Sequence, residues 1–208
     1  MKQIFFLALA LCLSTTMFAQ IGVGIRAGAT FSNLNFDAEG LDIQYDSRTG
    51  FVVGVPVEVR LPGPLGLQVE LNYSQFGSKF EQDLGTLGNF DVESVSNYLN
   101  IPVLLKVGKV GESFELSALA GPSFGYALTA KTISNDVEQD VEWTDEDVRS
   151  NIGFVLGAQG GLPVGPGKVT LDARYNLGLN DLDDQDEDVK ITNRQFQVAL
   201  GYMWTFGA

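Results

Sequence analysis

Residues 191–206 read ITNRQFQVALGYMWTF, and the side chains of this stretch alternate in size and polarity with a period of two. One parity is large and apolar: Phe196, Val198, Leu200, Tyr202, Trp204 and Phe206. The other parity is polar or smaller: Gln195, Gln197, Ala199, Gly201, Met203 and Thr205. Successive side chains of a β-strand point to opposite faces of the sheet, so the stretch predicts a strand with one continuous apolar face.

The same alternation recurs in seven earlier segments of the chain. We place the eight strands at residues 21–31, 49–61, 66–78, 95–107, 113–128, 150–162, 168–178 and 192–206. Links after even-numbered strands are short and rich in turn residues (LPGPL, GKVGE and PVGPG), whereas links after odd-numbered strands are long. This pattern predicts an all-β fold: an eight-stranded antiparallel up-and-down transmembrane β-barrel with short periplasmic turns and long extracellular loops.

The chain begins with MKQIFFLALALCLSTTMFAQ, in which Lys2 precedes an apolar run from Ile4 to Leu13. A basic residue, a short apolar run and then small or polar residues are typical of a secretory signal peptide. The run is too short for a membrane-spanning helix, which needs about 20 apolar residues. We therefore expect residues 1–19 to be a cleaved signal peptide and residues 20–208 to form a barrel domain in the cell outer membrane.

Composition argues against several classes of function. The whole sequence contains no histidine, and residues 20–208 contain no cysteine, so the commonest general base, the commonest metal ligand and a thiol nucleophile are all missing. The GPSFG segment at 121–125 matches a nucleophile elbow in letters, but that motif needs a histidine base and a strand-to-helix turn. A net charge of -13 disfavours nucleic acid. We predict a protein that is not an enzyme and has no cofactor.

Charged residues inside the predicted strands fall on the polar parity. We predict that this face lines the lumen and that neighbouring strands pair its acids with its bases. The predicted network consists of Arg26, Glu58, Arg60, Glu70, Lys106, Glu115, Asp172 and Arg174. Because the interior of an eight-stranded barrel is just wide enough for side chains to fill it, we expect a charge-plugged barrel.

The opposite parity is apolar, as contact with outer-membrane lipid requires, and its aromatic residues gather near the strand ends. Two aromatic girdles at the two membrane interfaces are typical of such barrels. The predicted girdle residues are Tyr73, Phe124, Tyr126 and Tyr175 towards the long loops, and Phe114, Tyr202, Trp204 and Phe206 towards the short turns.

Five residues fit this pattern poorly. Pro56, Pro102 and Pro122 fall inside predicted strands, where each removes a ladder hydrogen bond, and we expect bulges or local strand ends there. Leu104 and Phe76 have the parity of the lumen although they are apolar. Either residue marks a bulge or an apolar contact inside the barrel, and the sequence leaves both readings open.

The four long links are acidic. Of the 26 Asp and Glu residues, 21 lie in residues 32–48, 79–94, 129–149 and 179–190. One run is a candidate for attracting divalent cations weakly: Asp181, Asp183, Asp184, Asp186 and Asp188. Part of it resembles the start of an EF-hand loop, but Val189 and Gln195 occupy the positions of its glycine and final glutamate. A solvated loop is therefore the favoured interpretation, and we predict no defined metal site.

Four short segments resemble a known family: FAQ at 18–20, GIRAG at 24–28, YLNIPVLLK at 98–106 and AGPSFGY at 120–126. They are similar to the porin-like, PorT-like outer-membrane β-barrel proteins of the Bacteroidetes. The resemblance implies an outer-membrane barrel inserted by the barrel assembly machinery and allows a part in a protein-export machine. It implies no catalytic residue. The chain departs from barrels generally in that Gly207 and Ala208 follow the terminal aromatic Phe206.

Three functions remain open at this stage. The first is a structural or interaction barrel, whose loops meet a protein partner at the cell surface or in a secretion machinery. The second is a narrow porin-like channel for small solutes, with cation preference expected from the acidic mouth. The third is a soluble lipocalin-like barrel, which would turn its apolar face inward around a small ligand.

Overall fold

The structure is a computed structural model that describes residues 20–38, 46–83, 89–111, 113–134, 137–141, 143, 148–181 and 189–207. Within these residues the chain forms strands only: β1 (Gln20–Ala38), β2 (Asp46–Arg60), β3 (Leu65–Asp83), β4 (Asn89–Val110), β5 (Glu115–Ser134), β6 (Val137–Asp140), β7 (Ser150–Val164), β8 (Gly167–Gly178) and β9 (Val189–Phe206). The predicted signal peptide lies outside the described residues and stays a prediction. No helix in the described part has the length and apolarity needed to cross a membrane.

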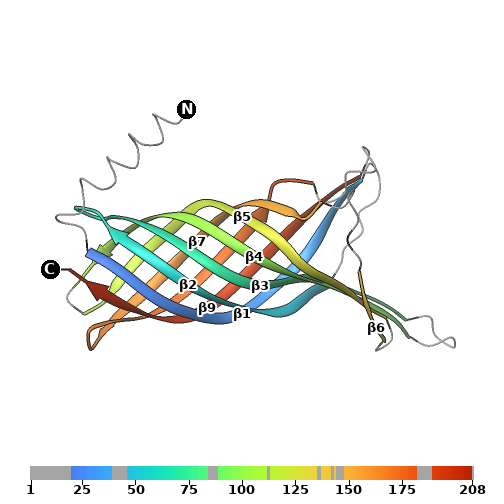
Figure 1. Cartoon of the computed structure of the whole chain (residues 1–208), viewed down its shortest axis with the longest axis horizontal. Coiled ribbons are helices and arrows are strands. Elements are labelled where there is room, and N and C mark those ends of the chain that lie inside the picture. The colour runs from blue at the N-terminus through green and yellow to red at the C-terminus, as the bar shows by residue number, and fades with distance from the viewer. Residues whose placement is uncertain are drawn as a thin grey trace.

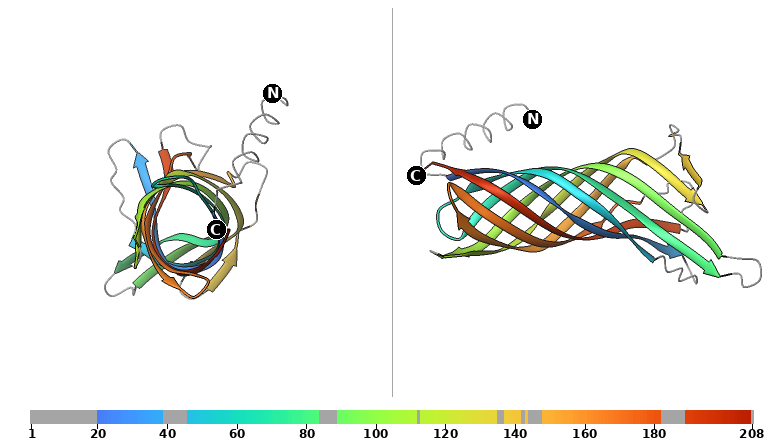
Figure 2. Two further views of the ribbon diagram at one scale, coloured as in Figure 1. Left: turned by 90° about the vertical axis from the view of Figure 1, so that its left-hand side faces the viewer. Right: turned by 90° about the horizontal axis from the view of Figure 1, so that it is seen from below.

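Eight of the strands close into a barrel. Each strand pairs antiparallel with its neighbours in the order β4-β3-β2-β1-β9-β8-β7-β5, and pairing of β4 with β5 closes the ring. The view along the barrel in Figure 2 shows this closed ring, and Figure 1 shows its tilted strands from the side. The predicted eight-stranded antiparallel barrel is confirmed.

One end of the barrel carries the short turns and both ends of the barrel domain. Gln20 pairs with Arg60, and Ile21 pairs with Phe206, so β1 starts and β9 ends at this rim. Gly63 and Gly165 adopt φ angles of 84° and 59° in the β2–β3 and β7–β8 turns. Glycine adopts this left-handed region without the steric cost of a Cβ, which explains how these links turn so tightly.

The strands run further at the other end than the sequence predicts. β3 and β4 pair as far as Asp83 and Asn89, and β1 and β9 pair as far as Ala38 and Val189. β4 is 22 residues long, whereas a tilted strand crosses a bilayer in about 9–11 residues. The strands therefore project beyond the membrane.

The outer part of this projecting sheet includes β6, which pairs with the end of β5 and is missing from the eight predicted segments. Its sequence, VEQD, has all four side chains exposed. A strand wetted on both faces needs no apolar alternation, so the period of two that reveals a half-buried strand is absent there.

The barrel wall is inverted relative to a soluble protein. Leu200 is 60 % exposed on the outer face, whereas Glu70 is 1 % exposed inside. The burial of β8 alternates strictly from Lys168 to Asn176. Because the apolar face points outward, the lipocalin-like alternative, which needs that face turned inward, is wrong for this chain.

The three strand prolines do not cause bulges. Pro56, Pro102 and Pro122 each keep a paired residue on one neighbouring strand, and the ladder on the other side resumes in the same register. The register shifts lie instead just before Val52 and at Asn97. Proline has no backbone N–H, so each of these residues removes one hydrogen bond from one ladder and leaves the register unchanged.

The two apolar residues of lumen parity are interior contacts. Leu104 packs with Leu119 and Val155, and Phe76 packs with Tyr98 and Ala127. All of these side chains are buried. The lumen is therefore filled by two small apolar clusters in addition to its polar groups.

The outward apolar face predicts how the barrel tolerates charge. Leu200 lies midway between Trp204 and Phe196 on the outer face of β9, so Leu200→Arg places a cation near the bilayer midplane. We expect a loss of about 2–4 kcal/mol in folding free energy, against about 0–1 kcal/mol for the matched control Val164→Arg beside the β7–β8 turn. Chemical unfolding in lipid vesicles measures both. Equal losses at the two positions would contradict the proposed membrane orientation.

Candidate functional site

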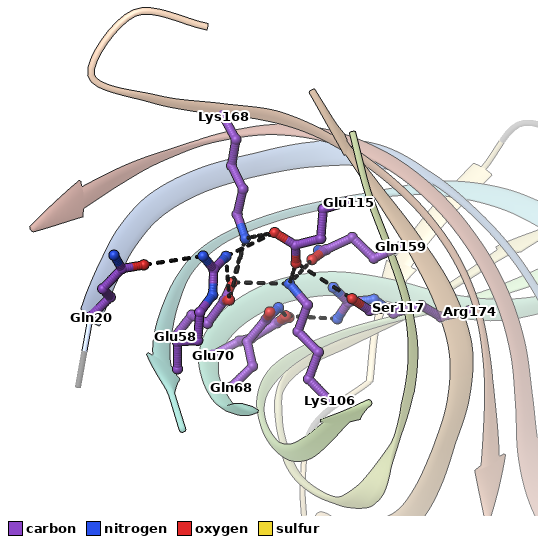
Figure 3. Close-up of polar contacts among 11 residues, drawn as sticks. Gln20, Glu58, Gln68, Glu70, Lys106, Glu115, Ser117, Gln159, Lys168 and Arg174 are labelled. Carbon is purple, nitrogen blue, oxygen red and sulfur yellow. Dashed lines mark hydrogen bonds and ion pairs between the residues drawn. The ribbon is translucent and has the colours of Figure 1, made fainter. Parts of the chain in front are cut away.

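The first charged cluster lies in the lumen near the short turns. It joins Glu58 of β2, Lys106 of β4, Glu115 of β5 and Lys168 of β8 (Figure 3). Lys106 Nζ lies 3.0 Å from Glu58 Oε2 and 2.5 Å from Glu115 Oε1. Lys168 Nζ lies 2.9 Å from each of the same two carboxylates. Two lysines and two glutamates thus alternate in a ring that connects four strands.

Two further side chains extend this turn-side cluster. Arg60 of β2 lies 2.8 Å from Glu115 Oε2 and donates a hydrogen bond to Gln20 Oε1 at 3.1 Å. Lys106 Nζ also donates to Gln159 Oε1 of β7 at 2.8 Å. The cluster therefore ties β1, β2, β4, β5, β7 and β8 together across the lumen.

The second charged cluster lies closer to the middle of the barrel and alternates in the same way. Arg26 of β1 lies 3.3 Å from Glu70 of β3 and 2.8 Å from Asp172 of β8. Arg174 of β8 lies 2.7 Å from each of these carboxylates. Gly157 of β7 lets the Arg174 side chain lie against the wall, because a Cβ there would come within 2.8 Å of Arg174 Cγ.

Amides complete the hydrogen bonding of Glu70. Gln68 Nε2 donates to Glu70 Oε1 at 2.5 Å, and Asn72 Nδ2 donates to Glu70 Oε2 at 2.8 Å. Both amides sit two residues from Glu70 on β3, so the alternation of the strand turns all three side chains inward. Glu70 therefore receives donors from three strands.

Some atoms of the mid-barrel cluster have no hydrogen-bond partner within the described protein: Arg26 Nε, Asp172 Oδ2, and Arg174 Nε and Nη2. Arg174 Nε contacts Asp172 as an ion pair without hydrogen-bond geometry. Arg174 lines a cavity of about 20 Å³ together with Asn72, Asn176 and Gln197. A polar cavity of this size holds about one water molecule, so we expect a bound water to satisfy part of this need.

The lumen holds nine charged side chains in the two clusters. Four are acids and five are bases, so together they carry a charge of +1. Eight of the side chains are at most 8 % exposed, and Arg60 is 27 % exposed. Charges at this depth are stable only when they are paired and hydrogen-bonded.

All eight charged residues that the sequence places in the lumen lie in these two clusters. The structure adds Lys168, which the sequence analysis does not name. A signal for it exists: Lys168 shares the parity of Asp172 and Arg174 and opens the predicted strand at 168–178. The sequence does not distinguish this interior position from a solvated one, because Lys168 lies next to a turn, where an exposed lysine is equally expected.

The predicted girdle residues lie on the outer wall. Near the short turns, Trp204 stacks edge-on against Tyr202 with ring centroids 4.8 Å apart, and the Tyr202 hydroxyl donates to Val164 O at 2.9 Å. Phe114 and Phe206 are exposed at the same end. Towards the loops, Tyr73 contacts Phe51, Tyr175 pairs with Phe196 in the ladder, and Phe124 and Tyr126 are exposed.

The acidic run that begins at Asp181 is described only at its first residue. Asp181 Oδ1 accepts a hydrogen bond from the backbone N–H of Ile191 at 2.9 Å, which fixes the start of this link against β9. Asp183, Asp184, Asp186 and Asp188 lie outside the described residues, so the proposed attraction of cations stays a prediction. Among the residues that the structure describes, no cluster of three metal-ligating side chains is present.

Comparison with known proteins gives one family match. A family model described as "Outer membrane protein beta-barrel domain" matches residues 18–184. No curated protein matches the chain.

Several solved structures are similar to this barrel. Ail, the attachment invasion locus protein of Yersinia pestis, is 16 % identical, with a TM-score of 0.43 and coverage of 90 % of this chain and 100 % of its own. OprG from Pseudomonas aeruginosa is 14 % identical, with a TM-score of 0.48 and coverage of 90 % and 96 %. The outer membrane protease OmpT from Escherichia coli is 12 % identical, with a TM-score of 0.48 and coverage of 90 % and 97 %.

The mid-barrel cluster predicts a large effect from a single truncation. Glu70→Ala leaves Arg26 and Arg174 with Asp172 as their only carboxylate, and breaking a buried pair in this way costs about 3–5 kcal/mol. The matched control is Lys131→Ala at the exposed Lys131–Glu138 pair, where solvent screens the charges and we expect little or no loss of stability. Equilibrium unfolding in vesicles measures both. A loss at Glu70 no larger than at Lys131 would show that the interior pairing does not stabilise the barrel.

Proposed function

The chain belongs to the outer membrane protein beta-barrel domain family, and from this membership and its charged interior we propose that it is a structural or interaction barrel with a closed lumen. The barrel anchors the protein in the outer membrane, and its projecting strands and acidic loops meet a partner. The ion pairs across the lumen close it to ions and polar solutes. The observation that carries this proposal is the burial of the interior charges.

The burial of the interior charges distinguishes a plugged barrel from an open pore. In a water-filled channel, solvent reaches the charged side chains that line the lumen. Here Glu70 and Arg26 are at most 2 % exposed at their side chains, and both contact partners on other strands. Lys106 and Lys168 cross the lumen at the turn end in the same way. Bulk solvent therefore has little access to these interior charges, which a conducting pore would keep hydrated.

The inside and the outside of the molecule also differ in net charge. The whole chain carries -13, and residues 20–208, without Lys2, carry -14. The nine lumen residues carry +1, so the remaining residues of the barrel domain carry -15. In the described part of the projecting sheet, Lys131 pairs with Glu138 and Asp140 at the surface. A strongly acidic surface steers basic partners towards it. We propose a protein partner with a basic face, at the cell surface or in a secretion machinery, as the PorT-like resemblance also allows.

The acidic run from Asp181 to Asp188 belongs to this proposed outer surface. Its carboxylates attract divalent cations loosely through their summed charge, without a fixed coordination site. The protein as a whole is proposed to be non-catalytic. The sequence lacks histidine, and each interior carboxylate is paired with basic side chains.

Conductance in planar lipid bilayers tests the closed lumen. We expect the unmodified protein to give no resolved unitary steps, because paired side chains fill the interior. The double variant Glu70→Ala/Arg174→Ala removes one acid and one base together, keeps the lumen charge unchanged and empties part of its middle. We expect it to conduct in resolved steps.

Two controls keep this experiment interpretable. Each protein is first checked for a mobility difference between boiled and unboiled gel samples, which reports a closed barrel. Lys131→Ala should remain silent like the unmodified protein. Resolved, cation-selective steps from the unmodified protein would overturn the plug and favour the narrow channel instead.

A further inference from the structure

The lumen changes character towards the long-loop end. Beyond the charged clusters, Phe76 of β3 and Tyr98 of β4 meet edge to face, with ring centroids 5.1 Å apart and planes at 66°. Ala127 of β5 completes this buried cluster, and Trp143, from the link between β6 and β7, packs against it. The turn end of the barrel is thus charged, whereas its loop end is aromatic.

A cavity of about 160 Å³ opens beside this cluster. Its apolar wall comes from separate parts of the barrel: Leu34, Phe76, Tyr98, Trp143, Val148 and Ile191. Apolar cavities of about 150 Å³ bind benzene in other proteins. The volume therefore fits one small ring.

Polar groups also line this cavity. Ser94 and Ser96 of β4 and Asn193 of β9 line it. A few placed polar groups in a mainly apolar pocket are what orients a small ligand. A ring with one hydroxyl group matches this combination better than a pure hydrocarbon does.

The Trp143 wall of the cavity is held in place from outside. The Arg149 guanidinium lies 5.1 Å from the centroid of the Trp143 ring and 4.7 Å from that of Tyr126. Arg149 Nη2 also donates to Ala127 O at 3.0 Å, and Ala127 N donates to Arg149 O at 2.8 Å. Arg149 therefore fixes Trp143 to the rim through a cation–π contact and backbone hydrogen bonds to β5.

We propose that this cavity is a binding site for a small, uncharged aromatic alcohol of phenol size, taken from the outer medium. The acidic loops at the same end disfavour an anion, so an aromatic carboxylate is a poor ligand. The charged clusters below the cavity stop the molecule from passing through. The site goes beyond the proposed anchoring function, because it stands whether or not the loops bind a protein.

Tryptophan fluorescence of the full barrel in lipid nanodiscs tests the site with phenol as the probe. The chain has two tryptophans: Trp143 at the cavity and Trp204 on the outer wall at the opposite end. In Trp204→Phe, where Trp143 alone reports, we expect a saturable change on titration with phenol. In Trp143→Phe, where Trp204 alone reports, we expect only a linear change from phenol dissolved in lipid.

A second experiment fills the cavity with an introduced side chain. Ser96→Phe in the Trp204→Phe background places a ring inside it and should weaken phenol binding at least tenfold. Ser94→Phe serves the same purpose if the first variant lacks the mobility shift of a closed barrel. Benzoate should bind at least tenfold more weakly than phenol.

Three results would overturn the site. The first is a linear response at both tryptophans, which would mean partition into lipid only. The second is saturable binding that survives both filling variants. The third is benzoate binding as tight as that of phenol, which would contradict the assignment of an uncharged ligand.

Discussion

The charges of this barrel must find their partners inside it, and the rest of the structure depends on that constraint. Hydrocarbon outside offers no compensation for a buried ion, and an unpaired one costs several kcal/mol. The chain meets the constraint with two rings of alternating acid and base, one built on Glu58, Lys106, Glu115 and Lys168, the other on Arg26, Glu70, Asp172 and Arg174. β8 contributes Lys168 to the first ring and Asp172 and Arg174 to the second. The two rings are therefore held in register by one strand.

Much of this arrangement can be predicted from the sequence because a strand has only two faces. Once residues such as Leu200 and Val198 are assigned to lipid, Gln197 and the other residues of its parity must face the lumen. Eight of the nine charged residues of the two clusters follow from that parity. The ion-pair partner of each residue cannot be predicted in this way, because parity does not indicate how far a side chain reaches across the lumen. Lys106, for example, pairs with a carboxylate on β2, which is not adjacent to β4.

The features that the sequence misses have separate physical reasons. β6 is wetted on both faces and shows no alternation, so nothing in its residues indicates a strand. The effect of Pro56 is also hidden, because a closed ladder can lose one hydrogen bond and keep its register. Phe76 has the parity of the lumen, and only the fold shows that it packs against Tyr98 near a cavity.

We propose that the lumen between the two ends is closed to bulk water, and thiol accessibility tests this proposal most directly. The barrel domain contains no cysteine, so one introduced thiol reports one place. Ala199→Cys puts it inside, opposite Gly28 and Asp172 in the ladder, where the native side chain is 1 % exposed. Val137→Cys on β6 is the exposed reference. In intact outer membranes, a membrane-impermeant thiol reagent should label position 137 rapidly and leave position 199 unlabelled until the barrel is unfolded. Labelling of both positions at similar rates would mean a water-filled lumen and would contradict the account.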